Sequence, residues 1–351
     1  MKSQSLVAYG EPLAETSREA PVPTGTQVLL KITHCGVCHS DLHLQDGYFD
    51  LGGDKKLDVT GGRELPFTLG HEIEGEVVAA GPDAEGVSAG DKVVAYPWIG
   101  CGACATCGRG EEHLCSEKDA QVLGVTVDGG FSDHVMVPHP RYLLDFSGIP
   151  AGLAGTYMCS GLTAYSALKK IGTPGDGDKI LIVGLGGVGM MGLQFARALF
   201  GAAPLVADID AGKLETARQM GAAAAYDSSQ KEAVKALLSE TGGGVYAAID
   251  FVGSESSFAF ANRAVRKGGR IVVVGLLGGA LKMPLPMIPI RAISIAGSFV
   301  GSLQETCEVL DLVKAGKVAP IPVEQRPMSQ ANSALDDLRD RQVTGRVVLA
   351  P

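Results

Sequence analysis

Four of the eight cysteines lie within fifteen residues, which is the closest grouping of possible metal ligands in the sequence. They follow the spacing C-x2-C-x2-C-x7-C, at Cys101, Cys104, Cys107 and Cys115. Thiolates are preferred zinc ligands, and four protein ligands leave no coordination position open, so the spacing predicts a structural zinc site. An iron–sulfur cluster and unligated reduced cysteines are the alternatives, but the spacing differs from common ferredoxin runs. Such clustering, without a secretion signal, favours metal binding over disulfides.

A second possible ligand set is dispersed along the chain. Cys38, His71 and Cys159 offer two thiolates and one imidazole, and three protein ligands would leave the fourth zinc position free for water or substrate. Each residue alone is weak evidence, because a lone histidine is more often structural. The other two cysteines, Cys35 and Cys307, are interpreted as core residues.

A glycine-rich motif follows an apolar run and opens a helical pattern. The run 179–183 leads into Gly184-x-Gly186-x-x-Gly189, and a helix is expected over 188–200. In this context the glycines allow a tight turn and close approach of the backbone to a dinucleotide pyrophosphate at the helix N-terminus. The candidate cofactor contacts are Gly184, Gly186, Gly187, Val188 and Gly189.

Asp208 ends the next expected strand, where a carboxylate would meet the hydroxyls of an adenosine ribose. The alternative interpretation is a cap for the helix expected over 211–220. Lys213 is a weaker candidate for the same ribose face. No arginine occurs in the turn 210–212 to receive a 2′-phosphate, which favours NAD over NADP.

The order of the expected elements places these motifs in two kinds of structure. Residues 1 to about 150 contain short apolar runs separated by Gly, Pro and Asp. Helical segments then alternate with β-branched runs at 179–183, 205–208, 245–250, 270–274 and 292–296, and a further helix is expected over 304–314. This alternation predicts an α/β fold with a doubly wound parallel sheet. We expect a β-rich catalytic domain over 1–152, completed by 298–351, a dinucleotide-binding domain over 153–297, and a ligand cleft between them.

The composition is that of a folded protein. Charged residues make up 20% of the chain and the net charge is -9. No Lys/Arg-rich stretch is present to neutralise phosphates, so nucleic acid is not an expected partner. Residues 180–196 carry no charge, but glycines divide them into strand, turn and helix, so no membrane span is expected. Residues 1–5 lead into a strand-like run without an apolar signal core, so we expect a cytoplasmic protein.

The chain resembles the medium-chain zinc-containing alcohol dehydrogenases over its whole length, most closely the tetrameric type of bacteria and archaea. The matching motifs are Gly36-Val-Cys-His-Ser-Asp41, Gly70-His-Glu72, the four-cysteine loop, Cys159-Ser-Gly-Leu-Thr-Ala-Tyr165 and Gly184-Leu-Gly-Gly-Val-Gly189. The resemblance implies a GroES-like catalytic domain, a Rossmann domain and two zinc ions per chain. It also implies NAD-linked conversion of a primary or secondary alcohol to an aldehyde or ketone.

The resemblance assigns roles to single residues. Cys38, His71 and Cys159 would hold a catalytic zinc, and Glu72 would lie beside the metal as an outer or transient ligand. Zinc can lower the pKa of an alcohol hydroxyl, so the released proton needs a path out of a dry site.

The family's proton relay falls on Ser40 and His43. Ser40 carries a rotatable hydroxyl and His43 titrates near neutral pH. The residues alone leave open a turn or helix cap for Ser40 and a surface imidazole for His43. The cofactor phosphates would contact His39, the Gly184 loop and Arg346.

Substrate contacts and assembly are less well defined. Trp98 and Phe49, with residues 276–277, are candidate apolar walls by analogy, although such aromatics are more often core. The segment 47–66 is longer and more polar than in many relatives, and it is either the rim of the substrate entrance or a surface loop. Residues 291–300 resemble the stretch through which relatives pair, so we expect a homo-oligomer, either a tetramer or a dimer.

Two other functions stay open. A zinc-free reductase of quinones or activated alkenes would keep the glycine loop but has no need for Cys38, His71 and Cys159 together. A zinc-stabilised dinucleotide sensor without activity is disfavoured by the complete set of relay residues. Relatives that act on polyols often have a glutamate where this chain has Cys159, which disfavours a polyol substrate.

Overall fold

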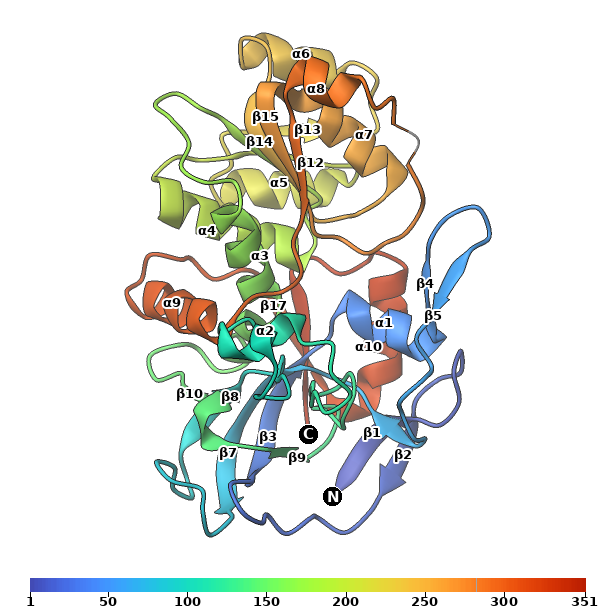
Figure 1. Ribbon diagram of the computed structural model, residues 1–351, viewed down its shortest axis with the longest axis vertical. Coiled ribbons are helices and arrows are strands. Elements are labelled where there is room, and N and C mark those ends of the chain that lie inside the picture. Colours follow the sequence, from blue (N-terminus) through green and yellow to red (C-terminus); the bar gives the residue numbers. More distant parts are fainter. Residues whose placement is uncertain (282) are drawn as a thin grey trace.

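The computed structural model describes residues 1–281 and 283–351, which form two lobes (Figure 1). The upper lobe in this view contains a six-stranded parallel sheet in the order β13-β12-β11-β14-β15-β16. Its strands are β11 (Ile180–Val183), β12 (Leu205–Asp208), β13 (Ala224–Asp227), β14 (Val245–Asp250), β15 (Val265–Val273) and β16 (Ser294–Gly297). Its helices are α4 (Gly187–Phe200), α5 (Ala211–Gln219), α6 (Ala233–Glu240), α7 (Glu255–Ala264) and α8 (Met287–Arg291). The strand order reverses between β11 and β14, and ligands usually bind at such a switch point.

The predicted doubly wound sheet is confirmed. The five expected β-branched runs correspond to β11, β12, β14, β15 and β16, the last lying two residues later than predicted. Strand β13 was not predicted, because its sequence Ala224-Ala-Tyr-Asp227 lacks the β-branched residues that mark the other strands. It forms because it extends the sheet beside β12.

Strand β11 explains why the sheet is covered on both faces. Its side chains alternate between two apolar cores, with Ile180 and Ile182 in one and Leu181 and Val183 in the other. The first core includes the buried side chain of Met190 on α4. A strand that is apolar on both faces is typical of a parallel sheet covered by helices.

The lower lobe is built around a seven-stranded sheet that takes strands from both ends of the chain. The order is β10-β8-β7-β3-β18-β17, and β9 also pairs with β3. A smaller sheet has the order β2-β1-β6. The strands are β1 (Lys2–Leu6), β2 (Ala14–Ser17), β3 (Val28–Gly36), β6 (Phe67–Thr68), β7 (Glu72–Ala80), β8 (Lys92–Ala95), β9 (His134–Val137), β10 (Leu143–Asp145), β17 (Val323–Pro327) and β18 (Arg346–Ala350).

The remaining helices are short. They are α2 (Ala105–Gly108), η1 (Glu112–Leu114), η2 (Pro140–Tyr142), η3 (Ala154–Met158), α3 (Ser160–Lys169), α9 (Leu303–Lys314), η4 (Met328–Gln330) and α10 (Ala331–Arg339). The expected helix over 304–314 is α9. Within the described residues, no helix has the length and apolar character needed to cross a membrane.

Helix α1 (His39–Asp46) and a hairpin follow β3 directly. The helix ends at Gly47 in the left-handed conformation, with φ of 80°. The chain then forms β4 (Tyr48–Asp50) and β5 (Lys56–Asp58), which project from the lower lobe toward the upper lobe (Figure 1). The backbone N–H of Gly279 donates to the Asp50 carbonyl at 3.4 Å. Part of the segment 47–66 is therefore a hairpin that reaches the upper lobe.

Candidate metal and cofactor sites

Three segments that are far apart in sequence bring two cysteines and a histidine together. Cys38 is the N-terminal cap of α1, His71 directly precedes β7, and Cys159 separates η3 from α3. Antiparallel pairing of β3 with β7 sets Gly36 opposite Glu72, which brings the first two residues to the same end of the sheet. One ligand atom of each residue lies within 4.8 Å of the others, and all three side chains are buried.

The surroundings of His71 fit a metal ion. Both ring nitrogens are buried without a hydrogen-bond partner, which is costly for polar atoms that nothing binds. Two sulfurs and an imidazole are ordinary zinc ligands, and a set of three leaves one position open. A hydrogen bond from Cys159 lowers the pKa of the Cys38 thiol well below its ordinary value, and the same contact raises the pKa of Cys159.

Asp41, to which the sequence analysis gave no role, lies behind two of these ligands. One of its oxygens accepts a hydrogen bond from the Cys38 N–H at 2.9 Å, and the other lies 3.4 Å from His71 Nδ1. The side chain is fully buried. Carboxylates beside a metal-ligating histidine fix the orientation of its ring, so Asp41 is placed to orient His71. The sequence did contain a signal, because an acid three residues after a helix cap is the capping-box spacing.

Glu72 and Arg346 form a buried ion pair. Glu72 Oε1 accepts hydrogen bonds from the Arg346 guanidinium and from the Ser160 N–H, whereas Oε2 has no partner. Burial raises the pKa of Glu72, and the charge of Arg346 opposes that shift. Arg346 also touches Gly187, where any side chain would collide with the arginine. The ion pair therefore connects the surroundings of the metal ligands with the glycine loop.

Ser40 and His43 follow Cys38 along α1. The Cys38 sulfur lies 3.8 Å from Ser40 Oγ. Ser40 is not the helix cap, since Cys38 has that position. His43 is half-buried, and burial lowers its pKa from the ordinary value of 6.5. His39, at the first position of the helix, is exposed.

The glycine loop has the backbone that its sequence predicts. Gly184 has φ of 89°, in the left-handed region, and Gly189 lies so close to the Gly184 carbonyl that no side chain would fit. Helix α4 begins after Gly186, with Gly187 and Val188 in its first turn. No side chain caps this helix, so its first N–H groups are available to an anionic ligand.

Asp208 lies between the glycine loop and the turn before α5. Its carboxylate accepts hydrogen bonds from the N–H groups of Leu185, Ile209 and Asp210 at 2.5, 2.7 and 2.9 Å. The cap of α5 is Asp210, which accepts from the Lys213 N–H at 3.0 Å. The helix-cap interpretation of Asp208 is therefore wrong. The Lys213 ammonium donates to the Arg341 carbonyl at 3.2 Å.

Trp98 lies against the metal ligands. It is buried, its indole N–H donates to the Met158 carbonyl at 3.0 Å, and its ring centroid is 5.4 Å from that of His71. Phe299, which the sequence analysis did not name, packs edge-on against Trp98 at 5.8 Å and is 49% exposed. A lone aromatic after an edge strand carries no local signal of this contact. Phe49 instead packs against His43, with ring centroids 4.6 Å apart and the ring planes tilted by 37°.

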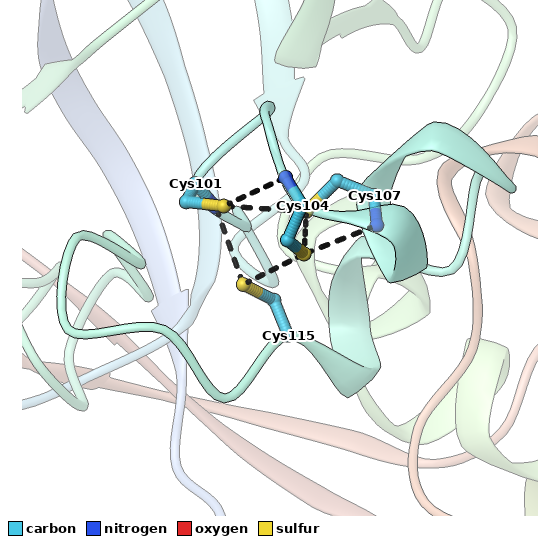
Figure 2. A group of neighbouring side chains, drawn as sticks. All are labelled: Cys101, Cys104, Cys107 and Cys115. Atoms are coloured by element: carbon cyan, nitrogen blue, oxygen red, sulfur yellow. Dashed lines mark hydrogen bonds between the residues drawn. The ribbon is translucent and has the colours of Figure 1, made fainter.

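The four clustered cysteines converge on one point, and their sulfurs form a compact group (Figure 2). The Cys101–Cys107, Cys104–Cys107 and Cys104–Cys115 sulfur pairs are 3.9, 3.5 and 3.9 Å apart. A tetrahedron with Zn–S bonds of about 2.3 Å has edges of about 3.8 Å. The backbone N–H of Cys107 donates to the Cys104 sulfur and lowers the pKa of that thiol to about 7. The group therefore has the size that a four-thiolate zinc site requires.

Comparisons with known proteins agree with this geometry. Residues 24–147 match the family model of the alcohol dehydrogenase GroES-like domain, and residues 187–315 match that of the zinc-binding dehydrogenases. An NAD-dependent alcohol dehydrogenase from Sulfurisphaera tokodaii is 36% identical over 352 residues, with 100% of both chains covered.

Solved structures lead to the same family. The alcohol dehydrogenase of the archaeon Aeropyrum pernix has a TM-score of 0.89 at 30% identity, covering 100% of both chains. A cobalt- and zinc-bound thermostable alcohol dehydrogenase from Pyrobaculum aerophilum has a TM-score of 0.86 at 25% identity, covering 100% of this chain and 99% of that one. The resemblance seen in the motifs is thus confirmed, and the chain belongs to the medium-chain zinc-containing alcohol dehydrogenases.

Proposed function

We propose that the chain is a zinc- and NAD-dependent alcohol dehydrogenase that moves hydride reversibly between a primary or secondary alcohol and NAD. The observation that carries the proposal is the buried set of Cys38, His71 and Cys159, with one coordination position left open. The Glu72–Arg346 pair connects this set with the glycine loop. Zinc held by the three ligands would polarise the alcohol oxygen, and NAD would accept the hydride.

A panel of simple alcohols, aldehydes and ketones with NAD or NADH tests this activity. We expect NADH absorbance to grow with at least one alcohol, and the activity to disappear when a chelator removes zinc. A zinc-free reductase would survive chelation and reduce an activated alkene or quinone. A dinucleotide sensor would bind NADH without turnover.

The proton path proposed for this reaction runs from Ser40 to His43. Ser40 can accept and donate through one hydroxyl, and a neutral imidazole can take the proton on. Because burial lowers the pKa of His43, the ring is neutral at and above neutral pH. The rate of alcohol oxidation should therefore fall only on the acid side, as the pH drops through that pKa and His43 loses its acceptor.

His43→Gln should slow alcohol oxidation at neutral pH by about ten- to a hundredfold, with partial recovery when imidazole or another buffer base is added. His139→Gln, at an exposed histidine outside the site, is the control and should leave the rate unchanged. An unaltered rate and pH profile in His43→Gln would mean that the proton leaves by another route.

The proposed substrate wall is apolar. The Trp98 ring contacts His71, and the Phe299 ring contacts Trp98 on from there. Phe49 lies against His43, at the other end of the proposed proton path. These rings favour alcohols with a small or medium apolar substituent.

We place the domain boundaries after residues 152 and 297. We place the protein in the cytoplasm, in line with its eight unpaired cysteines.

The oligomer proposed for this chain pairs through the open edge of the six-stranded sheet. Strand β16 ends the sheet order, all four of its residues are exposed, and Ile295 on it is 41% exposed. Ile295→Lys should shift the protein from a multiple of 36.2 kDa toward the monomer in sedimentation experiments. Val22→Lys, at an exposed valine outside this sheet, should leave the assembly intact. An unchanged mass in Ile295→Lys would place the interface elsewhere.

A further inference from the structure

The segment that carries Cys159 packs closely against β7. Gly155 on η3 approaches the Glu72 carbonyl so closely that a side chain would displace the strand or the helix. Cys159 itself has φ of -129° and ψ of -73°, outside the helical region, and no side chain caps α3 after it. The position of its sulfur therefore depends on what holds the two ends of the segment 152–160.

Two carboxylates from β7 hold these two ends. Glu72 Oε1 accepts from the Ser160 N–H at 3.1 Å, and Glu74 Oε2 accepts from the Gly152 N–H at 2.9 Å. Side chains two residues apart on a strand point to the same face. Strand β7 is thus hydrogen-bonded to the segment at Ser160, immediately after Cys159, and at Gly152, seven residues before Cys159.

Glu74 is anchored on its other side. Its Oε1 lies 2.9 Å from His34 Nδ1 and accepts from the Thr33 hydroxyl at 3.2 Å. The side chain is 1% exposed, so every one of these contacts offsets the cost of burying a carboxylate. Gly152 has φ of 80°, in the left-handed region that favours glycine. Glu74 therefore holds the loop at a residue whose backbone conformation other residues rarely adopt.

We propose that Glu74 is a positioning residue for the three-ligand metal site. By tying Gly152 to β7 and to His34 on β3, it sets where the Cys159 sulfur lies relative to Cys38 and His71. The proposal rests on the assignment of these three residues as metal ligands. Outer partners of metal ligands commonly change metal affinity by about 10- to 100-fold, and Glu74 acts through the backbone, so we expect the lower end of that range.

Cobalt substitution tests this role with a readout other than turnover. Cobalt held by two thiolates and an imidazole absorbs differently from cobalt held by four thiolates, so the two sites are read separately. Glu74→Ala should shift the visible bands of the three-ligand site and speed release of that cobalt to a chelator by about tenfold. The bands of the four-cysteine site should not change.

Glu74→Gln is the conservative variant. Its amide oxygen can still accept from Gly152 and its NH2 can donate to His34 Nδ1, so it should restore the wild-type bands and release rate. Gln194→Ala is the control for loss of a buried side-chain bond to the backbone, because Gln194 is buried and donates to the Met220 carbonyl at 3.0 Å. It should show wild-type cobalt bands.

If Glu74→Ala does not fold, Glu74→Asp is measured, because a carboxylate shorter by one methylene cannot span His34 and Gly152 together. Wild-type bands and release rate in folded Glu74→Ala, or in Glu74→Asp where it replaces that variant, would overturn the proposal. Altered bands in Glu74→Gln equal to those of Glu74→Ala would overturn it as well. A wild-type protein that takes cobalt only at the four-cysteine site would instead overturn the ligand assignment, and the role of Glu74 with it.

Discussion

Cys38→Ser should abolish alcohol oxidation while the protein stays folded. Cys104→Ser should instead destabilise the fold while the protein that remains folded keeps some activity. Cys38 is one of only three ligands at the open site, and zinc at such a site stabilises the reaction by several kcal/mol. Since about 1.4 kcal/mol is a tenfold change in rate, we expect a loss of at least about a thousandfold. Cys104 belongs to the closed four-sulfur group, where zinc contributes to folding. Its loss should lower stability by on the order of 4 kcal/mol and leave some activity in the surviving protein.

Metal analysis, thermal unfolding and turnover measured together check this pair. Wild-type protein should contain two zinc ions per chain, and each variant should contain one. Cys307→Ser is the matched control, because this half-buried cysteine belongs to neither ligand set and should leave metal content, stability and rate unchanged. A single zinc in active wild-type protein, or normal turnover in Cys38→Ser, would contradict the assignment of two separate sites.

Asp208 should make the protein prefer NAD over NADP by about a hundredfold or more in kcat/KM, because a 2′-phosphate would meet a carboxylate of like charge. The carboxylate is fixed by three backbone N–H groups and still has acceptor capacity for a ribose hydroxyl. Lys213, the nearby cation, already donates to a backbone carbonyl. Ile209 is 56% exposed, so an arginine there would have room to meet a phosphate. Asp208→Gly with Ile209→Arg should shift the preference toward NADP.

Two further variants separate charge from structure. Asp208→Asn keeps the shape and one acceptor oxygen, which can still accept from the Ile209 and Asp210 N–H groups, but it loses the acceptor for the Leu185 N–H. It should reduce the discrimination at the cost of that one hydrogen bond. Asp210→Ala removes the true cap of α5 and should cost about 1 kcal/mol of stability with the cofactor ratio unchanged. Equal use of the two cofactors by the wild-type protein would show that Asp208 does not meet the ribose.

The sequence predicted the fold class and the four-cysteine group from local patterns. Strand–helix alternation defines the sheet, and cysteines at fixed spacing define the closed metal group. The dispersed set became readable only through the family motifs, since nothing local connects Cys38 with Cys159. The register between β3 and β7 is what brings its first two members together.

The residues that the sequence analysis missed are those whose role arises from tertiary packing. Asp41 looks like an ordinary acid in the first turn of a helix until the fold buries it behind His71. Phe299 becomes a neighbour of Trp98 only because the chain crosses back from the upper lobe after β16. The contact between Asp50 and Gly279 joins segments more than two hundred residues apart. No sequence pattern in either segment predicts this contact.

The position of β18 has a consequence for the order in which the protein can be built. This strand lies inside the seven-stranded sheet, between β3 and β17, and it also carries Arg346, the partner of Glu72. A chain leaving the ribosome therefore has every strand of the parallel sheet by residue 297, while the sheet beside the metal ligands still lacks two members. Domains usually complete in the order of synthesis. Here the lobe that starts first finishes last, because the sheet beside the ligand cysteines is complete only when β17 and β18 have been added.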